Sequence, residues 1–447
     1  MTTASIASAT APAPPRDDTE AGNYFVANYP PFSFWDQASV ASVLEVLETK
    51  PDPGVPLGLY FHIPFCRKRC HFCYFRVYTD KNAAEIKGYL DSAATEMRRV
   101  AAMPYITGRR PQYIYFGGGT PSYLSIPQLK DLTNRMKDHF PWDEAREVAF
   151  EAEPGTLTEK KLDAIRELGV TRLSLGVENF DDHILEINGR AHRSAEIEKA
   201  YWHARRTGFP QINIDLIAGM VEETDANWQR CIGKALELEP DCLTIYQMEI
   251  PYNTTIYKEM KEAGKLTAPV ANWSTKRRWV DEAFTAFEAA GYTVTSATTV
   301  VKNPAKTKFI YRDSLWAGSD LLPLGVASFG TLKGIHVQSH ADILPWQMLV
   351  DSGKLPYFRA HRMTEEESFV REFILRLKLG RIQASYYITK YGVDPRVRFA
   401  AELAALQAGG YGRVSGDDII LTREGLLQVD RLLHSFFLPD HRDARYT

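Results

Sequence analysis

The sequence predicts an α/β fold, either a barrel or an open parallel sheet, followed by a smaller helical module. Three observations lead to this prediction. From residue 58 onward, short runs rich in β-branched and aromatic residues alternate with amphipathic stretches, which is typical of strand–helix repeats. Glycine and cysteine motifs follow the first two of these runs. Near residue 361 the alternation gives way to helical patterns with one hairpin.

The composition indicates a globular protein and argues against nucleic-acid binding and membrane association. The chain has 447 residues, of which 45% are hydrophobic and 24% charged, so it is long enough for two or three units and resembles a globular protein. The net charge of -3 argues against a nucleic-acid partner. Because no apolar run reaches the roughly 20 residues that a membrane helix needs, we expect no membrane association. Residues 1–22 read as a disordered leader without a signal-peptide core, so we expect a cytoplasmic protein.

The first expected unit after the leader covers residues 23–57, an aromatic strap followed by a helix. The strap, residues 24–35, is rich in aromatic residues and broken by prolines, so it either packs over a surface or closes an active site.

The second expected unit, residues 58–335, contains the alternating elements. We predict buried parallel strands over residues 59–63, 113–116, 148–152, 172–176, 212–217 and 243–247. The helices between them are predicted over residues 83–100, 126–139, 159–168, 195–206 and 227–238. A further helix over 279–290 leads to a β-like stretch over 292–295 and then to irregular chain.

The third expected unit, residues 336–447, is a helical, winged-helix-like module. A capping box at residues 364–367 predicts the start of a helix. A turn at residues 415–417 joins the two halves of a predicted hairpin over residues 411–421.

Three cysteines carry the strongest chemical signal. Cys66, Cys70 and Cys73 have C-x3-C-x2-C spacing directly after the first predicted strand. Three thiolates on one loop cannot complete a tetrahedral zinc site alone. They can hold three irons of a [4Fe–4S] cluster and leave the fourth iron open for a ligand. Cys231 and Cys242 stand apart and read as small core residues.

A glycine run supports the same site. Residues 116–121, FGGGTP, end the second predicted strand and therefore lie at the same edge as the cysteine loop. Glycines let a ligand approach the backbone without a side-chain clash. A cluster with an open iron beside such an edge suits S-adenosylmethionine.

The chain resembles the radical S-adenosylmethionine (radical SAM) superfamily, in the branch of oxygen-independent coproporphyrinogen III oxidase and its relatives. The matching segments are YFHIPFC (60–66), FGGGTP (116–121), FEAEP (150–154), RLSLGVE (172–178), NGR (188–190) and NIDL (213–216). The resemblance implies a partial (β/α)6 barrel with added strands and a helical C-terminal domain. It implies a [4Fe–4S] cluster, one or two molecules of S-adenosylmethionine, a small organic substrate and an electron donor such as flavodoxin or ferredoxin.

The resemblance also implies roles for single residues. Those expected to line the cluster-bound cofactor are Tyr60, Phe72, Gly118, Gly119 and Thr120. Those expected to bind its amino acid, its ribose or neighbouring groups are Glu151, Glu178, Arg190 and Asp215. Glu249 and Phe329 are expected to contact a second S-adenosylmethionine.

Two positions depart from the oxidase pattern. Phe75 stands where the family has a further cysteine, and Glu178 replaces the usual glutamine. Both changes argue against porphyrinogen decarboxylation, whereas the strap is an oxidase feature that heme chaperones lack. The sequence therefore predicts a two-cofactor radical enzyme that transfers a methyl or methylene group to an sp2 carbon. The alternatives are a decarboxylating coproporphyrinogen III oxidase and a heme chaperone.

Overall fold

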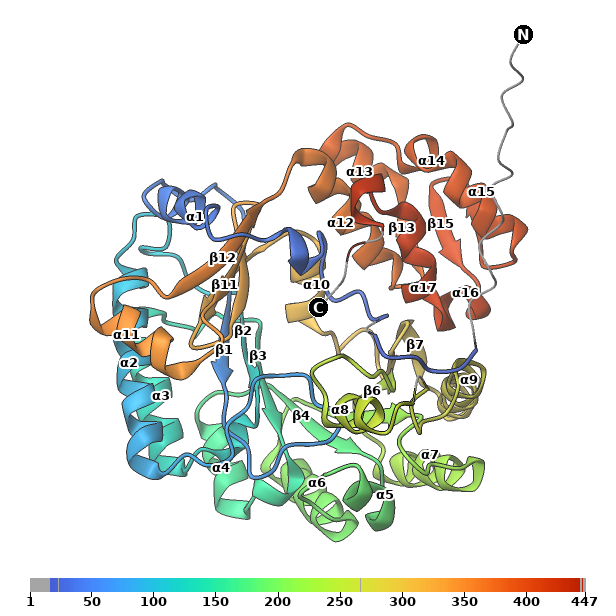
Figure 1. The fold of residues 1–447 in the computed structure, drawn as a ribbon, viewed down its shortest axis with the longest axis horizontal. Helices are drawn as coiled ribbons and strands as arrows, with labels where there is room; N and C mark the ends of the chain where they lie inside the picture. The colour runs from blue at the N-terminus through green and yellow to red at the C-terminus, as the bar shows by residue number, and fades with distance from the viewer. Residues whose placement is uncertain (1–16, 23, 266, 443, 445–447) are drawn as a thin grey trace.

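A computed structural model describes residues 17–22, 24–265, 267–442 and 444. Its framework is a twelve-stranded sheet in the order β12-β11-β10-β9-β1-β2-β3-β4-β5-β6-β8-β7 (Figure 1). The central strands β1 to β6 are parallel and follow chain order. This is the partial six-stranded barrel that the sequence predicts. The central strands are β1 (Leu57–Ile63), β2 (Tyr113–Gly118), β3 (Glu147–Ala152), β4 (Arg172–Glu178), β5 (Gln211–Ala218) and β6 (Cys242–Gln247).

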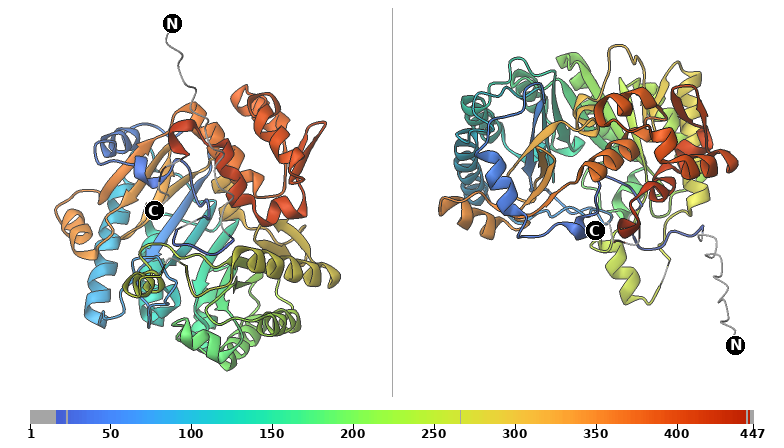
Figure 2. Two further views of the ribbon diagram at one scale, coloured as in Figure 1. Left: turned by 45° about the vertical axis from the view of Figure 1, so that its right-hand side comes forward. Right: turned by 90° about the horizontal axis from the view of Figure 1, so that it is seen from above.

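Helices between the central strands cover one face of the sheet (Figures 1 and 2). Their starts are fixed by side chains that accept backbone N–H groups of the first turn, such as Asn82 before α2, Ser125 before α3 and Thr224 before α7. Such caps satisfy donors that the helix itself leaves unpaired. These helices are α2 (Ala83–Ala101), α3 (Ile126–His139), α4 (Glu159–Glu167), α5 (Asp182–Ile187), α6 (Ser194–Thr207) and α7 (Asp225–Leu238). Two further helices, α8 (Thr255–Glu262) and α9 (Trp273–Ala289), follow β6.

The sheet extends beyond the central strands at both edges, and here the structure corrects the sequence prediction. The stretch expected to be irregular up to residue 335 contains short strands and a helix. β9 pairs in parallel with β1, and β8 pairs antiparallel with β6. The added elements are β7 (Thr293–Ser296), β8 (Thr299–Val301), α10 (Ile310–Trp316), β9 (Asp320–Leu324), β10 (Phe329–Leu332), β11 (Ile335–Ser339), α11 (Ile343–Asp351) and β12 (Tyr357–Arg362).

The predicted boundary between residues 335 and 336 falls inside this sheet, because β11 pairs with β10 and β12 pairs with β11. The sheet therefore continues to Arg362, and the separate helical module begins at α12, where Thr364 forms the predicted capping box. A three-stranded sheet joins the helices of this module. Its elements are α12 (Glu365–Leu377), β13 (Arg381–Gln383), α13 (Ala384–Tyr391), α14 (Pro395–Arg398), α15 (Ala400–Ala408), β14 (Gly412–Ser415), β15 (Asp418–Leu421), α16 (Arg423–Leu427) and α17 (Val429–Leu433).

The segment that precedes the barrel joins the two units. Val26 and Tyr29 belong to the hydrophobic cluster of the C-terminal module, and the backbone carbonyl of Tyr29 accepts a hydrogen bond from His336 Nε2 of β11. Helix α1 (Val40–Leu47) follows and packs on β12. This segment is part of both cores rather than a loose strap.

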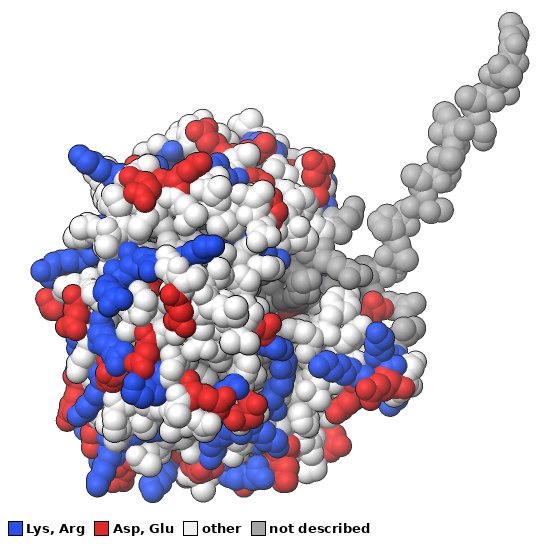
Figure 3. All heavy atoms as spheres, turned by 60° about the vertical axis from the view of Figure 1, so that its left-hand side comes forward, with Lys and Arg blue, Asp and Glu red and all other residues white. Residues whose placement is uncertain are grey.

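Most of the predicted leader, residues 1–16, lies outside the described residues. The remainder is ordered, since Asp17 accepts backbone N–H groups at the start of α9 and Thr19 bonds to Lys276. In the described part of the chain, no helix is both long and apolar enough to cross a bilayer. On the face drawn in Figure 3, acidic and basic side chains are interspersed rather than segregated.

Candidate active site

The three cysteines lie on the loop that leaves β1. The loop is closed at its base by backbone hydrogen bonds between Cys66 and Tyr78 and between Tyr78 and Pro64, at 3.1 and 2.8 Å. Its far end is tied to the barrel because the His71 backbone N–H donates to Asn188. The side chain of His71 bonds to the backbone of Ile187, so this histidine anchors the loop rather than joining the thiols.

The thiols have partners that favour an ionised sulfur. Thr120 donates its hydroxyl to Cys66 Sγ at 3.2 Å, and Arg190 donates to Cys70 Sγ at 3.3 Å. Burial nevertheless raises the pKa of Cys66 to about 12 and that of Cys73 to about 11. Thiolates therefore need a further positive charge, which bound iron supplies.

The spacing of the thiols suits a cluster better than a single ion. Among the residues that the structure describes, no three His, Cys, Asp or Glu side chains converge closely enough to hold one metal ion. A [4Fe–4S] cluster instead needs one thiolate at each of three separate irons. The donor set of this loop therefore fits the cluster that the sequence predicts.

The glycine run packs directly against the cysteine loop. The backbone N–H groups of Gly119 and Thr120 donate to the carbonyls of Ile63 and Phe65, both at 2.8 Å. A Cβ atom on Gly119 would lie 2.9 Å from those same carbonyl oxygens, closer than atoms can pack. Gly118 has a φ of 111°, a conformation that side chains oppose. Glycine at these positions lets the end of β2 pack against the cysteine loop, at the edge that the sequence predicts for the cofactor.

Three carboxyl groups, one each from β3, β4 and β5, line the cavity that the cysteine loop borders. Glu151 accepts hydrogen bonds from the Tyr115 hydroxyl and the Gly118 backbone, and Asp215 accepts from Ser174 and Asn213. Glu178 lies 3.7 Å from Arg190. We call Glu151, Glu178 and Asp215 the acidic floor.

Burial and mutual repulsion disfavour ionisation of the acidic floor. Burial raises the pKa of Glu151 and that of Glu178 to about 7, and it also raises the pKa of Asp215. A bound cation relieves this cost. S-adenosylmethionine carries a sulfonium and an ammonium group, so the acidic floor fits this cofactor as well.

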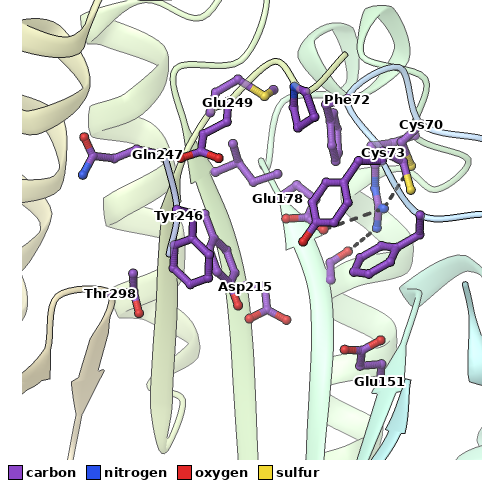
Figure 4. Close-up of a pocket in the computed structure, with 18 of the residues that line it drawn as sticks. Cys70, Phe72, Cys73, Glu151, Glu178, Asp215, Tyr246, Gln247, Glu249 and Thr298 are labelled. Carbon is purple, nitrogen blue, oxygen red and sulfur yellow. Dashed lines mark hydrogen bonds and ion pairs between the residues drawn. The ribbon is translucent and has the colours of Figure 1, made fainter. Parts of the chain in front are cut away.

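The cysteine loop and the acidic floor open into one cavity of about 610 Å³, a volume typical of small-molecule sites. Figure 4 shows Cys70, Cys73 and Phe72 on one side of it and Gln247 and Thr298 on the other. We use the name far wall for the part of the lining that comes from the N-terminal segment, β6, α9 and the C-terminal module. Its residues include Tyr24, Phe25, Tyr246, Gln247, Trp273, Arg277, Leu427 and Arg431.

Twelve of the fourteen residues that the sequence singles out line this cavity: Cys66, Cys70, Phe72, Cys73, Gly118, Gly119, Thr120, Glu151, Glu178, Arg190, Asp215 and Glu249. Tyr60 does not reach it; its ring stacks on Tyr115 and its hydroxyl bonds to His62. Phe329 lies outside it as well and packs on Phe32 and Trp35. Their contacts with a cofactor stay predictions.

The sequence prediction missed the far wall, except for Glu249 and the aromatic segment. Of that segment, only Tyr24 and Phe25 line the cavity, while Tyr29 and Trp35 are buried elsewhere. Trp273 and Leu427 come from helices that no motif marks as functional. Only the folded chain brings them together.

Known proteins resemble this chain in sequence and in fold. Residues 60–234 match the model of the radical SAM superfamily. Oxygen-independent coproporphyrinogen III oxidase from Synechocystis is 25% identical over 85% of this chain and 84% of its own length. The heme chaperone HemW of Bacillus subtilis is 28% identical over 84% of this chain and 98% of its own length. The structure of coproporphyrinogen III oxidase (HemN) from Escherichia coli covers 94% of this chain and 99% of its own, with a TM-score of 0.81 and 23% identity.

Proposed function

We propose that this chain, which belongs to the HemN-like family of radical SAM proteins, oxidises a flat, propionate-bearing substrate of the coproporphyrinogen type. The cofactors of this family are a [4Fe–4S] cluster and S-adenosylmethionine, which together supply a 5'-deoxyadenosyl radical that abstracts hydrogen. The observation that carries the proposal is the shared cavity, in which the far wall faces the cysteine loop and the acidic floor.

The protein's own residues support this reaction in three ways. Cys66, Cys70 and Cys73 hold the cluster, and the acidic floor neutralises the cationic cofactor. Tyr24, Phe25, Tyr246 and Trp273 give the cavity large aromatic surfaces. Such surfaces bind a flat apolar ring system and exclude water from a reactive carbon.

The electron balance of the proposed reaction defines its products. A propionate side chain loses one hydrogen atom to the 5'-deoxyadenosyl group, from the carbon attached to the ring. Loss of CO2 then leaves a vinyl group, and one electron passes to a one-electron acceptor. We propose flavodoxin or ferredoxin as the reductant of the cluster.

A second candidate is the transfer of a methyl or methylene group, which the sequence favours. Phe75, which replaces the family's further cysteine, lines the cavity, and so does Glu249. These two residues are the observations that favour this candidate.

Anaerobic turnover of the reconstituted protein with coproporphyrinogen III and S-adenosylmethionine tests the proposal. We expect CO2 and a product that has lost CO2 and two hydrogens per propionate. A heavier product together with S-adenosylhomocysteine would identify the second candidate. Stoichiometric heme binding without turnover would instead indicate a heme chaperone.

A further inference from the structure

Two arginines of the far wall come from distant parts of the chain. Arg277 is on α9 of the barrel, and Arg431 is on α17 of the C-terminal module. Both side chains line the cavity that contains the cysteine loop. The two units are held together beside them, since Arg423 of α16 pairs with Asp281 and Glu288 of α9. The position of Arg431 relative to Arg277 is therefore fixed by the docking of the module.

Neither guanidinium has an anionic partner within the part of the chain that the structure describes. Arg277 forms no ion pair and no side-chain hydrogen bond there. Arg431 donates to the neutral Gln428 and Tyr411 side chains, at 2.5 and 3.4 Å. Its Nε atom is buried without an acceptor. Because neither guanidinium is paired with a carboxylate, both are available to an anion that enters the cavity.

The other arginine of α9 has the usual arrangement of a surface arginine. Arg278, the next residue of α9, points away from the cavity and pairs with Asp225 and Glu282 at 2.5 and 2.8 Å. Burial lowers the pKa of Arg277, and the charge of Arg431 lowers it further. Asp17 and Glu424 offset this repulsion from a distance. Two like charges held together beside a cavity favour a bound anion.

Charges of both signs line the cavity. The acidic floor lies beside the cysteines, where a cationic cofactor fits, whereas Asp17, Glu249 and Asp430 line the cavity together with Arg277 and Arg431. Asp430 is already paired with Lys378, and Glu249 accepts the backbone N–H of Tyr24. Trp273 also lines the cavity, with the centre of its ring 3.4 Å from Lys276 Nζ, 5.9 Å from the Arg277 guanidinium and 5.0 Å from the ring of Tyr24. An aromatic surface bordered by cations suits an apolar ring that carries acidic side chains.

We propose that Arg277 and Arg431 together bind a carboxylate of the substrate and so orient it across the cavity from the cysteine loop. The proposal rests on the proposed function, because it assigns the part of the same cavity that recognises the substrate. A guanidinium can donate two parallel hydrogen bonds to one carboxylate. Because one arginine comes from each unit, the substrate bridges the barrel and the C-terminal module.

Binding of stable acids to the cluster-loaded protein tests this site. The probes are coproporphyrin III, its tetramethyl ester and naphthalene-2,6-dicarboxylate, titrated in the presence of S-adenosylmethionine and followed by fluorescence. Arg277→Gln and Arg431→Gln should each weaken binding of the acids by about tenfold or more, as expected for a lost charged hydrogen bond. They should leave binding of the ester and of S-adenosylmethionine unchanged. The matched control Arg278→Gln should bind like the wild type.

The outcomes separate this inference from the proposed function. Arginine-dependent binding of the dicarboxylate without binding of coproporphyrin III would refute the tetrapyrrole substrate and support the carboxylate site. Wild-type affinity for the acids in both variants, or no binding of either acid to the wild type, would overturn the site. If a glutamine variant fails to fold, Arg277→Lys keeps the charge but loses the paired hydrogen bonds, and unchanged affinity in that variant would equally overturn it.

Discussion

Three of the five cysteines differ from the other two in their surroundings. Cys66, Cys70 and Cys73 share one loop, whereas Cys231 is buried on α7 beside Asn179. Replacing any loop cysteine by alanine should abolish the cluster, because no spare cysteine lies on that loop. Iron and sulfide analysis after anaerobic reconstitution should give about four of each per chain for the wild type and for the control Cys231→Ala. A full cluster in a loop variant would contradict the ligand set.

The acidic floor should make the affinity for S-adenosylmethionine depend on pH. Glu151 and Glu178 have pKa values raised to about 7 by burial, so both are largely protonated at lower pH. A cationic cofactor binds best to the ionised carboxylates. Affinity for S-adenosylmethionine should therefore gain a contribution from Glu178 as the pH rises from about 6 to about 8.

Calorimetric titrations of the wild type and of Glu178→Gln measure this contribution. The difference between the two proteins cancels the titration of the cofactor's own amino group. The exposed Glu198, paired with Lys234, provides the control Glu198→Gln. Identical pH profiles for the wild type and Glu178→Gln would show that Glu178 does not face the cation.

At the scale of the element, the start of α12 is fixed by a reciprocal cap. Thr364 accepts the backbone N–H of Glu367, and Glu367 accepts that of Thr364. Thr364→Ala should lower the free energy of unfolding by about 1 kcal/mol, measured by urea denaturation. The control is Ser368→Ala, which removes a hydroxyl that donates to the Thr364 carbonyl but keeps both hydrogen bonds of the reciprocal cap, and it should change the free energy of unfolding by less than about 0.5 kcal/mol. Equal stability of Thr364→Ala and the wild type would be the contrary result.

Long elements could be predicted and short ones could not. The six central strands and the five longer helices between them have clear patterns of apolar residues, and their predicted bounds lie within a few residues of those observed. The sequence does not predict the six-residue helix α5. The strands β8 to β10 have three to five residues each, too few to show a period. β9 and β8 are strands because β1 and β6 provide partners, and β10 is one because it pairs with β9 and β11. Partners distant in sequence leave no local signal.

The candidate site also has one part that the sequence predicts and another part that it does not. The cysteine loop and the glycine edge are local motifs, so their side of the cavity could be found from the sequence. Arg277, Trp273 and Arg431 lie on ordinary amphipathic helices, and nothing in their neighbours marks them. Their role depends on how the C-terminal module docks on α9.

At the scale of the whole molecule, the N-terminal segment connects barrel, module and cavity. Tyr24 donates its backbone N–H to Glu249, and Val26 donates to Asp430. Removing the segment would also expose the core that contains Tyr29, so smaller changes are needed. Tyr24→Ala with Phe25→Ala should leave the cluster intact and raise the ratio of 5'-deoxyadenosine to product severalfold, because the far wall loses its water-excluding rings.

Chromatographic quantification of both products measures this ratio. Phe34→Ala, in the same segment but packed on His441, is the control and should keep the wild-type ratio. Unchanged coupling in the double variant would mean that Tyr24 and Phe25 only fill space.

The central claim is that the cavity holds a substrate C–H bond against the radical that its cofactors supply. Its most direct test uses coproporphyrinogen III deuterated on the propionate carbon attached to the ring, with unlabelled S-adenosylmethionine. Mass spectrometry should find one deuterium in 5'-deoxyadenosine for each CO2 released. Unlabelled 5'-deoxyadenosine during productive turnover, with deuterium entering it only from methyl-deuterated S-adenosylmethionine, would contradict the claim.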